Sequence, residues 1–192
     1  MGVKVRTFIA AEIPREVQDR AASLIARLQG SDAKVKWVRP EQLHWTLKFL
    51  GDVELEEIPA VCARVTEAVA DIRAFDVEAH GAGAFPDPRR PRTVWLGVSR
   101  GAEEMVELHA AVERSLVPLG FRAEGRKFRP HVTIGRVRNS PVGIAELGRL
   151  ITENADFDGG VSTVFEVVVF SSELHRDGPT HQPLAHIPLA PN

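Results

Sequence analysis

Two short segments of this sequence each carry a histidine and a threonine separated by one apolar residue. They are HWTLKF at residues 44–49 and HVTIGR at residues 131–136. Seven histidines and eight threonines in 192 residues predict about 0.3 His-x-Thr tripeptides by chance, whereas the chain contains two. In a β-strand, side chains two positions apart point to the same face. Each segment is therefore expected to present an imidazole beside a hydroxyl.

A pair of imidazoles suits general acid and base catalysis near neutral pH. Imidazole titrates near pH 6.5, so one histidine can accept a proton while the other donates one. This arrangement fits in-line attack at phosphorus, where one oxygen arrives as another leaves. Taken singly, His44 or His131 is more typical of a histidine hydrogen-bonded within a sheet, but the repetition favours catalysis. We therefore predict both as catalytic, with the hydroxyls of Thr46 and Thr133 binding the phosphate oxygens.

Three further side chains in these segments are candidates for substrate binding. Arg136 closes the second segment, and its guanidinium would complement a phosphate dianion. Lys48 shares the face of His44 if the strand stays regular, although a solvated lysine at a strand edge fits equally well. Alternation places Phe49 in the core, and it would stack on a base only if the strand twists near Gly51.

The net charge of the chain limits how it could contact nucleic acid. The formal charge is −2, which gives no overall attraction to phosphate and argues against extended wrapping of a nucleic acid. Basic residues nevertheless cluster near the second segment, which predicts a positive rim that holds a substrate by its end. These residues are DPRRPR at 87–92 and Arg122, Arg126, Lys127, Arg129, Arg136 and Arg138.

The same order of elements is expected in both halves of the chain: strand, helix, strand, helix, strand. This order, with no flexible linker between the halves, predicts one bilobed α+β domain over residues 1–192, in which pseudo-twofold packing brings both segments to one cleft. A glycine- and proline-rich loop is expected at 81–92 and a turn at 176–181. Helices are expected over 14–30, 54–71, 101–120 and 143–154, and strands over 3–13, 34–38, 43–51, 74–80, 93–98, 127–137, 163–174 and 182–190.

Several classes of protein are disfavoured by composition. The chain has no run of eighteen apolar residues, and its amino terminus lacks the apolar region and cleavage site of a signal peptide. We therefore expect a cytoplasmic protein. The single cysteine, Cys62, cannot form an internal disulfide. We also expect a monomer that needs no cofactor or metal and does not bind membranes.

The two segments and their surroundings resemble the two-histidine phosphoesterase superfamily. The closer resemblance is to the bacterial and archaeal RNA 2′,3′-cyclic phosphodiesterases, also called 2′-5′ RNA ligases. It extends through RTFIA, LHWTLKFLG, VWLGV, FRPHVTIGR and SSELHRDGPTHQPL in that order. The resemblance implies a bilobed α+β fold with two antiparallel sheets lining a cleft and helices outside. It also implies metal-independent opening of a terminal 2′,3′-cyclic phosphate on RNA, tRNA fragments included, to a 2′-phosphate, and allows reversible 2′-5′ ligation.

The resemblance also supplies roles that the residues alone do not distinguish. His44 matches the histidine that protonates the departing 3′ oxygen, and His131 matches the one that activates water. Thr46 and Thr133 match the threonines that hold the phosphate. The chain departs from the family after the late Gly-Pro turn, where relatives often carry an aromatic residue. Here the residues are Thr180 and His181, and we expect His181 at the surface.

Three other functions remain open from the sequence. A metallohydrolase could use both motif histidines as ligands, but no third ligand follows at a short fixed spacing. A non-catalytic module that binds RNA ends would not need both motifs intact. A cyclic phosphodiesterase acting on small nucleotides would use the same residues and the same chemistry.

Overall fold

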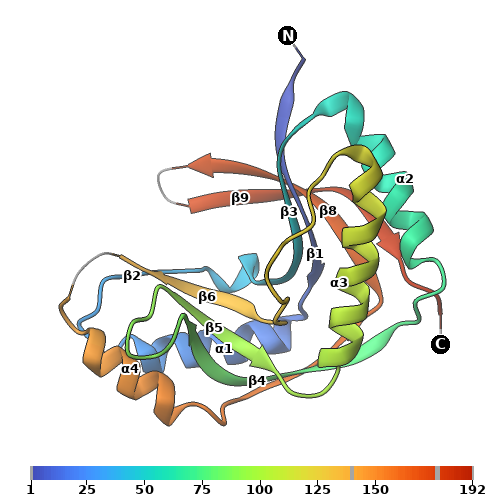
Figure 1. The fold of residues 1–192 in the computed structure, drawn as a ribbon. Coiled ribbons are helices and arrows are strands. Elements are labelled where there is room, and N and C mark those ends of the chain that lie inside the picture. The colour runs from blue at the N-terminus through green and yellow to red at the C-terminus, as the bar shows by residue number, and fades with distance from the viewer. Residues whose placement is uncertain (1, 139–140, 176–177, 192) are drawn as a thin grey trace.

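The computed structural model describes residues 2–138, 141–175 and 178–191, which form nine strands and four α-helices (Figure 1). The helices are α1 (Arg15–Leu28), α2 (Ile58–Val69), α3 (Ala102–Leu116) and α4 (Ile144–Glu153). One-turn 3₁₀ helices span Pro40–Gln42, Leu55–Glu57 and Val117–Leu119. The strands are β1 (Lys4–Glu12), β2 (Val35–Trp37), β3 (His44–Glu54), β4 (Phe75–Phe85), β5 (Thr93–Val98), β6 (Val132–Val137), β7 (Asp158–Val164), β8 (Glu166–His175) and β9 (Gly178–Pro188). The predicted α+β class is confirmed.

All nine strands belong to one curled sheet. Its order is β7-β4-β5-β6-β3-β1-β8-β9, and β2 adds to β6. Each of these neighbouring strands pairs antiparallel. The junction between β6 and β3 divides this order into two groups of four strands, joined through the pair Trp45 and Val132. Two separate sheets were expected, but the pairing of Trp45 with Val132 joins the two groups of strands into one continuous sheet.

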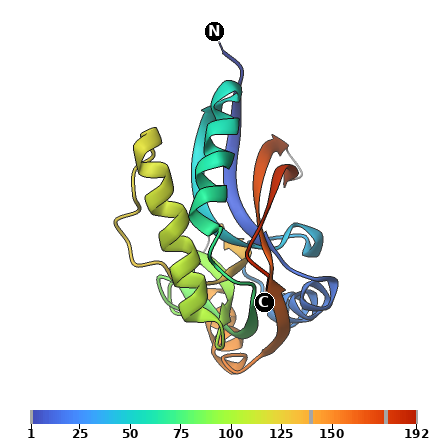
Figure 2. The same cartoon turned by 90° about the vertical axis from the view of Figure 1, so that its right-hand side faces the viewer.

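Each group of strands has its own pair of helices (Figures 1 and 2). Helices α1 and α4 pack against each other and against β7 and β4, respectively. Helices α2 and α3 pack against each other and against β9 and β3, respectively. Helix α1 buries Val17, Ala21, Leu24 and Leu28, which recur at helical spacing and so form one apolar stripe toward the sheet.

The predicted loop at 81–92 is partly strand, because β4 continues to Phe85. Glycines in this stretch predict a loop, but Gly83 is required here by packing within the sheet. Gly83 lies directly opposite Trp95 in β5, and a Cβ atom at Gly83 would overlap the indole ring. The glycine therefore lets the ring of Trp95 lie flat against the neighbouring strand.

The predicted strand at 163–174 is two strands in the structure. β7 ends at Val164 beside β4, and β8 begins at Glu166 beside β1. The start of β7 was not predicted, because Gly159 is a residue type that is rare in strands. In the structure this position requires glycine, since a Cβ there would crowd Ala79 and Leu96. The other predicted helices and strands are present, although several ends differ. In the predicted turn at 176–181, Arg176 and Asp177 lie outside the described residues.

Among the helices of the described residues, none is both long enough and apolar enough to span a membrane.

Replacing Gly83 with alanine is expected to destabilise the fold by about 1–3 kcal/mol, because the added methyl group displaces the ring of Trp95. Gly125→Ala is the matched control, since a Cβ there meets no atom within 4 Å. Urea unfolding of the two variants and the parent chain measures both effects. Equal stability of the two variants would contradict this account of Gly83.

Candidate active site

The two histidine motifs lie on adjacent strands, β3 and β6. Trp45 of β3 pairs with Val132 of β6, and both side chains are 0% exposed. Antiparallel register therefore sets the histidine of each motif opposite the threonine of the other. Directly opposite Cβ atoms in a sheet are about 4.5–5.5 Å apart. Because side chains alternate, all four polar residues face away from Trp45 and Val132 and share one surface of the sheet.

A β-bulge follows the threonine in each motif. The register of β3 with β1 skips Leu47, and the register of β6 with β5 skips Ile134. From the histidine onward, burial runs identically in both motifs: half-buried, buried, half-buried, buried, buried, exposed. An inserted residue reverses the alternation of the side chains that follow it. The last residue of each motif, Phe49 or Arg136, therefore returns to the side of the histidine.

Lys48 does not belong to this surface, so its prediction as a phosphate ligand is wrong. The side chain is only 2% exposed, and its ammonium pairs with the carboxylate of Glu113 in α3. It also donates a hydrogen bond to the carbonyl of Arg122 at 3.0 Å. The prediction required a regular strand, and the bulge at Leu47 instead turns Lys48 toward the helix side.

Phe49 is exposed at the surface rather than buried in the core. Its side chain is 56% exposed, and its ring centroid lies 5.9 Å from that of Phe8. Phe8 in turn lies 4.9 Å from the ring of His44. Alternation placed Phe49 in the core, which is wrong because the bulge precedes it. Its stacking on a base stays a prediction, now favoured by its position.

His44 is half-buried beside an apolar cluster on β1 and β8. Its Nδ1 lies 2.8 Å from the carbonyl oxygen of Gln42, which can only accept, so Nδ1 carries a proton and Nε2 remains for chemistry. Burial lowers the pKa of His44 to about 4; the bond to Gln42 opposes this shift, and the neighbouring His181 adds to it. His44 is therefore neutral at pH 7 in the free protein.

His131, directly before β6, has similar backbone and aromatic contacts. Its Nδ1 donates to the carbonyl of Arg129 at 2.6 Å, again two residues upstream. The ring of Phe85 lies edge-on at 5.0 Å. Burial lowers the pKa of His131, the bond to Arg129 opposes this shift, and the charge of Arg136 adds to it. In both motifs, therefore, a backbone carbonyl two residues upstream of the histidine fixes its tautomer.

The two threonines leave their hydroxyls available. Thr46 and Thr133 are half-buried opposite Ala10 and Trp95, respectively. Within the described residues, neither hydroxyl has a hydrogen-bond partner in the protein. Arg136 is exposed, and its charge acts on His131. The structure therefore groups these three predicted ligands with the two histidines.

His181 is a third histidine at this site, contrary to the surface position expected from sequence. Its ring lies 5.5 Å from that of His44 at an interplanar angle of 89° and 4.8 Å from that of Phe8. The side chain is half-buried, and burial lowers its pKa. The signal in the sequence was its place after the Gly-Pro turn, where relatives often carry an aromatic ring.

The cations of the predicted rim are exposed, but only two are tied to the site. The backbone carbonyl of Arg129 accepts the hydrogen bond from His131, and the charge of Arg136 lowers the pKa of His131. In the 87–92 loop, Arg89 forms an ion pair with Asp87 at 3.4 Å. The exposed cations in the second half are Arg122, Arg126, Lys127, Arg129, Arg136 and Arg138. A rim around the whole cleft stays a prediction.

One group of side chains in the described part of the chain has the spacing of metal ligands. It comprises Glu12, Glu166 and His186, whose ligand atoms lie within 4.8 Å of one another. His186 Nδ1 lies 3.0 Å from a Glu166 oxygen, so hydrogen bonding or an ion pair also explains this contact. Neither motif histidine belongs to the group.

Comparison with known proteins places the chain in a family. The model of the 2′-5′ RNA ligase superfamily matches residues 14–173. The RNA 2′,3′-cyclic phosphodiesterase of Methanothermobacter thermautotrophicus is 37% identical over 179 residues, 93% of this chain and 96% of that protein. The enzyme of the same name from Aeropyrum pernix is 37% identical over 172 residues, 86% and 95% of the two chains. The chain therefore belongs to the 2′-5′ RNA ligase superfamily.

Solved structures share the fold. A protein of Thermus thermophilus superposes with a TM-score of 0.80 at 25% identity over 96% of this chain and 97% of that one. E. coli LigT, crystallised with 3′-AMP, gives a TM-score of 0.76 at 23% identity over 97% and 99% of the two chains. The resemblance inferred from the motifs is thus confirmed at the level of family and fold.

Breaking the buried pair of Lys48 and Glu113 is expected to destabilise the protein by about 3–5 kcal/mol, because the remaining group loses its charged partner. Lys48→Met and Glu113→Gln test this, and the double variant Lys48→Met/Glu113→Leu should regain much of the loss. Arg64→Ala, in the exposed pair with Glu67 at 3.3 Å, is the control, with an expected effect below about 1 kcal/mol. Chemical denaturation at pH 7 measures all four variants. Single variants no less stable than the control would contradict the role of the pair.

His181→Phe is expected to raise the pKa of His44 above about 4, because a neighbouring imidazolium disfavours a second positive charge. The phenyl ring keeps the site buried, so the pKa should remain below its ordinary value of 6.5. NMR titration of the imidazole resonances in the free protein measures the shift. His175→Phe alters an exposed histidine of β8 and should leave His44 unchanged. The same His44 pKa in the parent chain and in His181→Phe would refute the coupling.

Proposed function

We propose that this protein is an RNA 2′,3′-cyclic phosphodiesterase that opens a terminal cyclic phosphate to a 2′-phosphate. The observation that carries the proposal is the register at Trp45 and Val132, which sets two imidazoles and two hydroxyls on one face. Relatives that bear this enzyme name match more than nine-tenths of the chain, as in Methanothermobacter thermautotrophicus. Neutral and protonated imidazoles at one phosphate supply the base and the acid that ring opening requires.

In the proposed reaction, Nε2 of His131 takes a proton from water as the water oxygen attacks phosphorus. The bond from phosphorus to the 3′ oxygen breaks, and its electron pair stays on that oxygen. Nε2 of His44 then donates the proton that the 3′ oxygen needs. Both Nδ1 atoms are held by backbone carbonyls, so the rings stay oriented through the step. The family resemblance is the basis for assigning acid and base.

The negative charge of the bound phosphate would raise the pKa of His44. Burial keeps His44 neutral in the free protein, yet an acid must carry a proton when the bond breaks. An anionic phosphodiester within a few ångströms favours the imidazolium and so raises its pKa. Donation from Thr46 and Thr133 and the charge of Arg136 would then balance the charge that develops on the phosphate oxygens.

Other aspects of the proposal rest on the resemblance and the repeated pattern. We infer a pseudo-twofold duplication, supported by the matched bulges and burial of the two motifs. The substrate range could extend to small cyclic nucleotides, since the same phosphate chemistry serves both. Reversible ligation, action on tRNA fragments, a monomeric state and a cytoplasmic location stay predictions.

His44→Ala and His131→Ala should each lower turnover of a short RNA ending in a 2′,3′-cyclic phosphate by about 10²- to 10⁴-fold, because each removes one proton-transfer group. Chromatography of the products distinguishes 2′-phosphate from 3′-phosphate ends. His175→Ala serves as the matched control and should keep full activity. Prolonged EDTA treatment should also leave the rate unchanged.

Near-normal turnover in either motif variant would overturn the acid and base proposal. Loss of activity with EDTA that zinc restores would instead support a metallohydrolase. Binding of the RNA end without turnover by the parent chain would support the non-catalytic module.

A further inference from the structure

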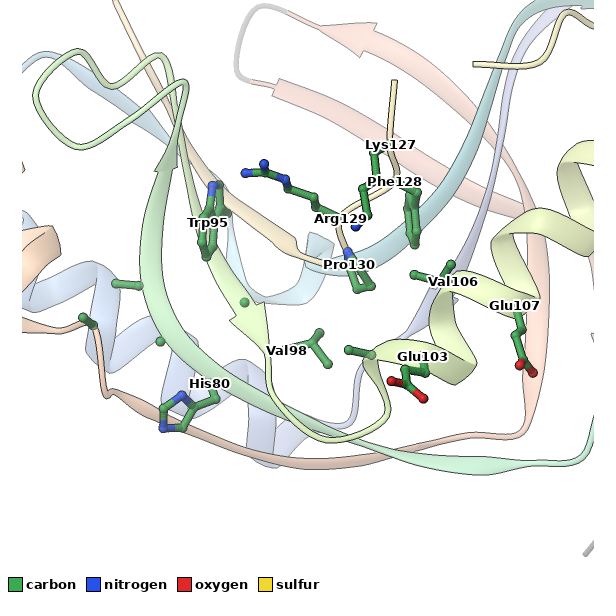
Figure 3. Close-up of a pocket in the computed structure, with 15 residues that line it drawn as sticks. His80, Trp95, Val98, Glu103, Val106, Glu107, Lys127, Phe128, Arg129 and Pro130 are labelled. Carbon is green, nitrogen blue, oxygen red and sulfur yellow. The ribbon is translucent and has the colours of Figure 1, made fainter. Parts of the chain in front are cut away.

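A groove of about 800 Å³ extends from Trp95 and residues 127–130, which directly precede His131 in the chain, to the first turns of α3 (Figure 3). Its volume lies within the range of sites that bind small molecules. Figure 3 shows Trp95 and Arg129 at one end, with the Arg129 side chain extending toward Trp95. Glu103 and Glu107 of α3 line the other end. The groove is therefore cationic and aromatic near the motif and acidic at its far end.

The near end of the groove is joined to the catalytic histidine by two contacts. The ring centroids of Trp95 and His131 are 6.4 Å apart. The backbone carbonyl of Arg129 accepts the hydrogen bond from His131 Nδ1 at 2.6 Å. Pro130, between Arg129 and His131, also lines the groove. A substrate bound at His131 could therefore continue directly into the groove.

The lining offers the two contacts that a nucleotide needs. Trp95 is half-buried, and Val106 on α3 is 40% exposed, so the groove presents apolar surface on which a base can stack. Lys127 and Arg129 are exposed on the segment that leads into β6 and can pair with a phosphate. The acidic far wall would repel a long phosphate backbone. The charges thus fit one or two nucleotides better than an extended strand.

The wall that carries these cations is anchored to the body of the protein. The ring of Phe128 stacks on that of His109 in α3, with centroids 4.0 Å apart and planes within 6°. Farther upstream, the amide of Glu124 donates to the carboxylate of Glu113 at 2.9 Å. This carboxylate is also the partner of the buried Lys48. The segment is therefore held in place before any ligand binds.

The opposite side of the site offers a different environment. Around His44 lie the rings of Phe8 and Phe170, and Glu12 lies opposite His44 in the register of β1 and β3. A terminal ribose with a cyclic phosphate carries its base at C1′ and the rest of the chain at C5′. The apolar surface beside His44 suits the terminal base. The basic side at His131 suits the phosphate that leads upstream.

We propose that the groove beside His131 binds the nucleotide preceding the cyclic phosphate, so that the enzyme acts on RNA ends in preference to cyclic mononucleotides. This inference rests on the proposed function and specifies its substrate class. Stacking of the preceding base and pairing of its phosphate are gained only by a chain of two or more nucleotides.

The test compares adenosine 2′,3′-cyclic phosphate with a trinucleotide of adenosines that ends in the same group. The parent enzyme should show a kcat/KM at least about 10-fold higher for the trinucleotide, as expected for one stacked base. Binding of the trinucleotide 2′-phosphate product, followed by fluorescence anisotropy, gives a readout that does not depend on turnover.

Val106→Glu places a negative charge in the groove, on α3 rather than on either motif strand, and should lower the trinucleotide preference to near one, with mononucleotide turnover unchanged. Val117→Glu is the matched control, since Val117 is 51% exposed near the other end of α3 and outside the groove. Arg129→Gln should also reduce the preference and weaken product binding, whereas Arg126→Gln, on the same exposed segment, should not.

A parent preference near one would overturn the inference, as would a preference that Val106→Glu and Arg129→Gln both leave intact. Neither of these results affects the proposed function, because turnover of adenosine 2′,3′-cyclic phosphate measures the cyclic phosphodiesterase activity separately. If neither substrate reacts, the proposed function fails. In that case, fluorescence anisotropy still tests whether the groove binds the nucleotide. Product binding that is lost in Val106→Glu but kept in Val117→Glu supports nucleotide binding in the groove, and equal binding by both variants rejects it.

Discussion

The geometry of the site depends on one backbone pairing, that of Trp45 with Val132, which joins the two halves of the sheet. Both side chains are fully buried, so the core fixes which face of each strand points inward. A slip of one residue would exchange the faces and bury the motif histidines. Burial of the side chains of Trp45 and Val132 thereby positions the histidines and threonines of both motifs on the opposite face of the sheet.

Burial keeps both motif histidines neutral in the free protein, which suits the proposed base His131 but leaves the proposed acid His44 without its proton until substrate arrives. Each ring is fixed by a carbonyl two residues upstream and packed against a phenyl ring, and desolvation lowers both pKa values. In the proposed reaction the phosphate anion offsets this cost, because it stabilises an imidazolium in a site with little water. The charge needed for catalysis is thus coupled to binding of the correct group.

The sequence predicted what local pattern and repetition encode. Apolar periodicity located the four helices, and the repeated His-x-Thr motif led to both histidines and both threonines, which the register at Trp45 and Val132 places on one face while their roles stay predictions. The bulges at Leu47 and Ile134 could not be predicted, because each depends on pairing with another strand. The assignments of Lys48 and Phe49 were therefore reversed between core and surface. His181 reaches His44 only through the pairing of β9, β8 and β1, which no local pattern reveals.

The matched bulges also bear on how the proposed site would bind an asymmetric substrate. In both motifs the bulge returns the last residue to the face of the histidine, but this residue is Phe49 in one and Arg136 in the other. One side consequently offers a ring and the other a guanidinium. The terminal ribose of RNA is asymmetric in the same way, with a base on one side and a phosphate chain on the other. In the proposed function, this difference between two similarly bulged strands would favour one orientation of the bound RNA end.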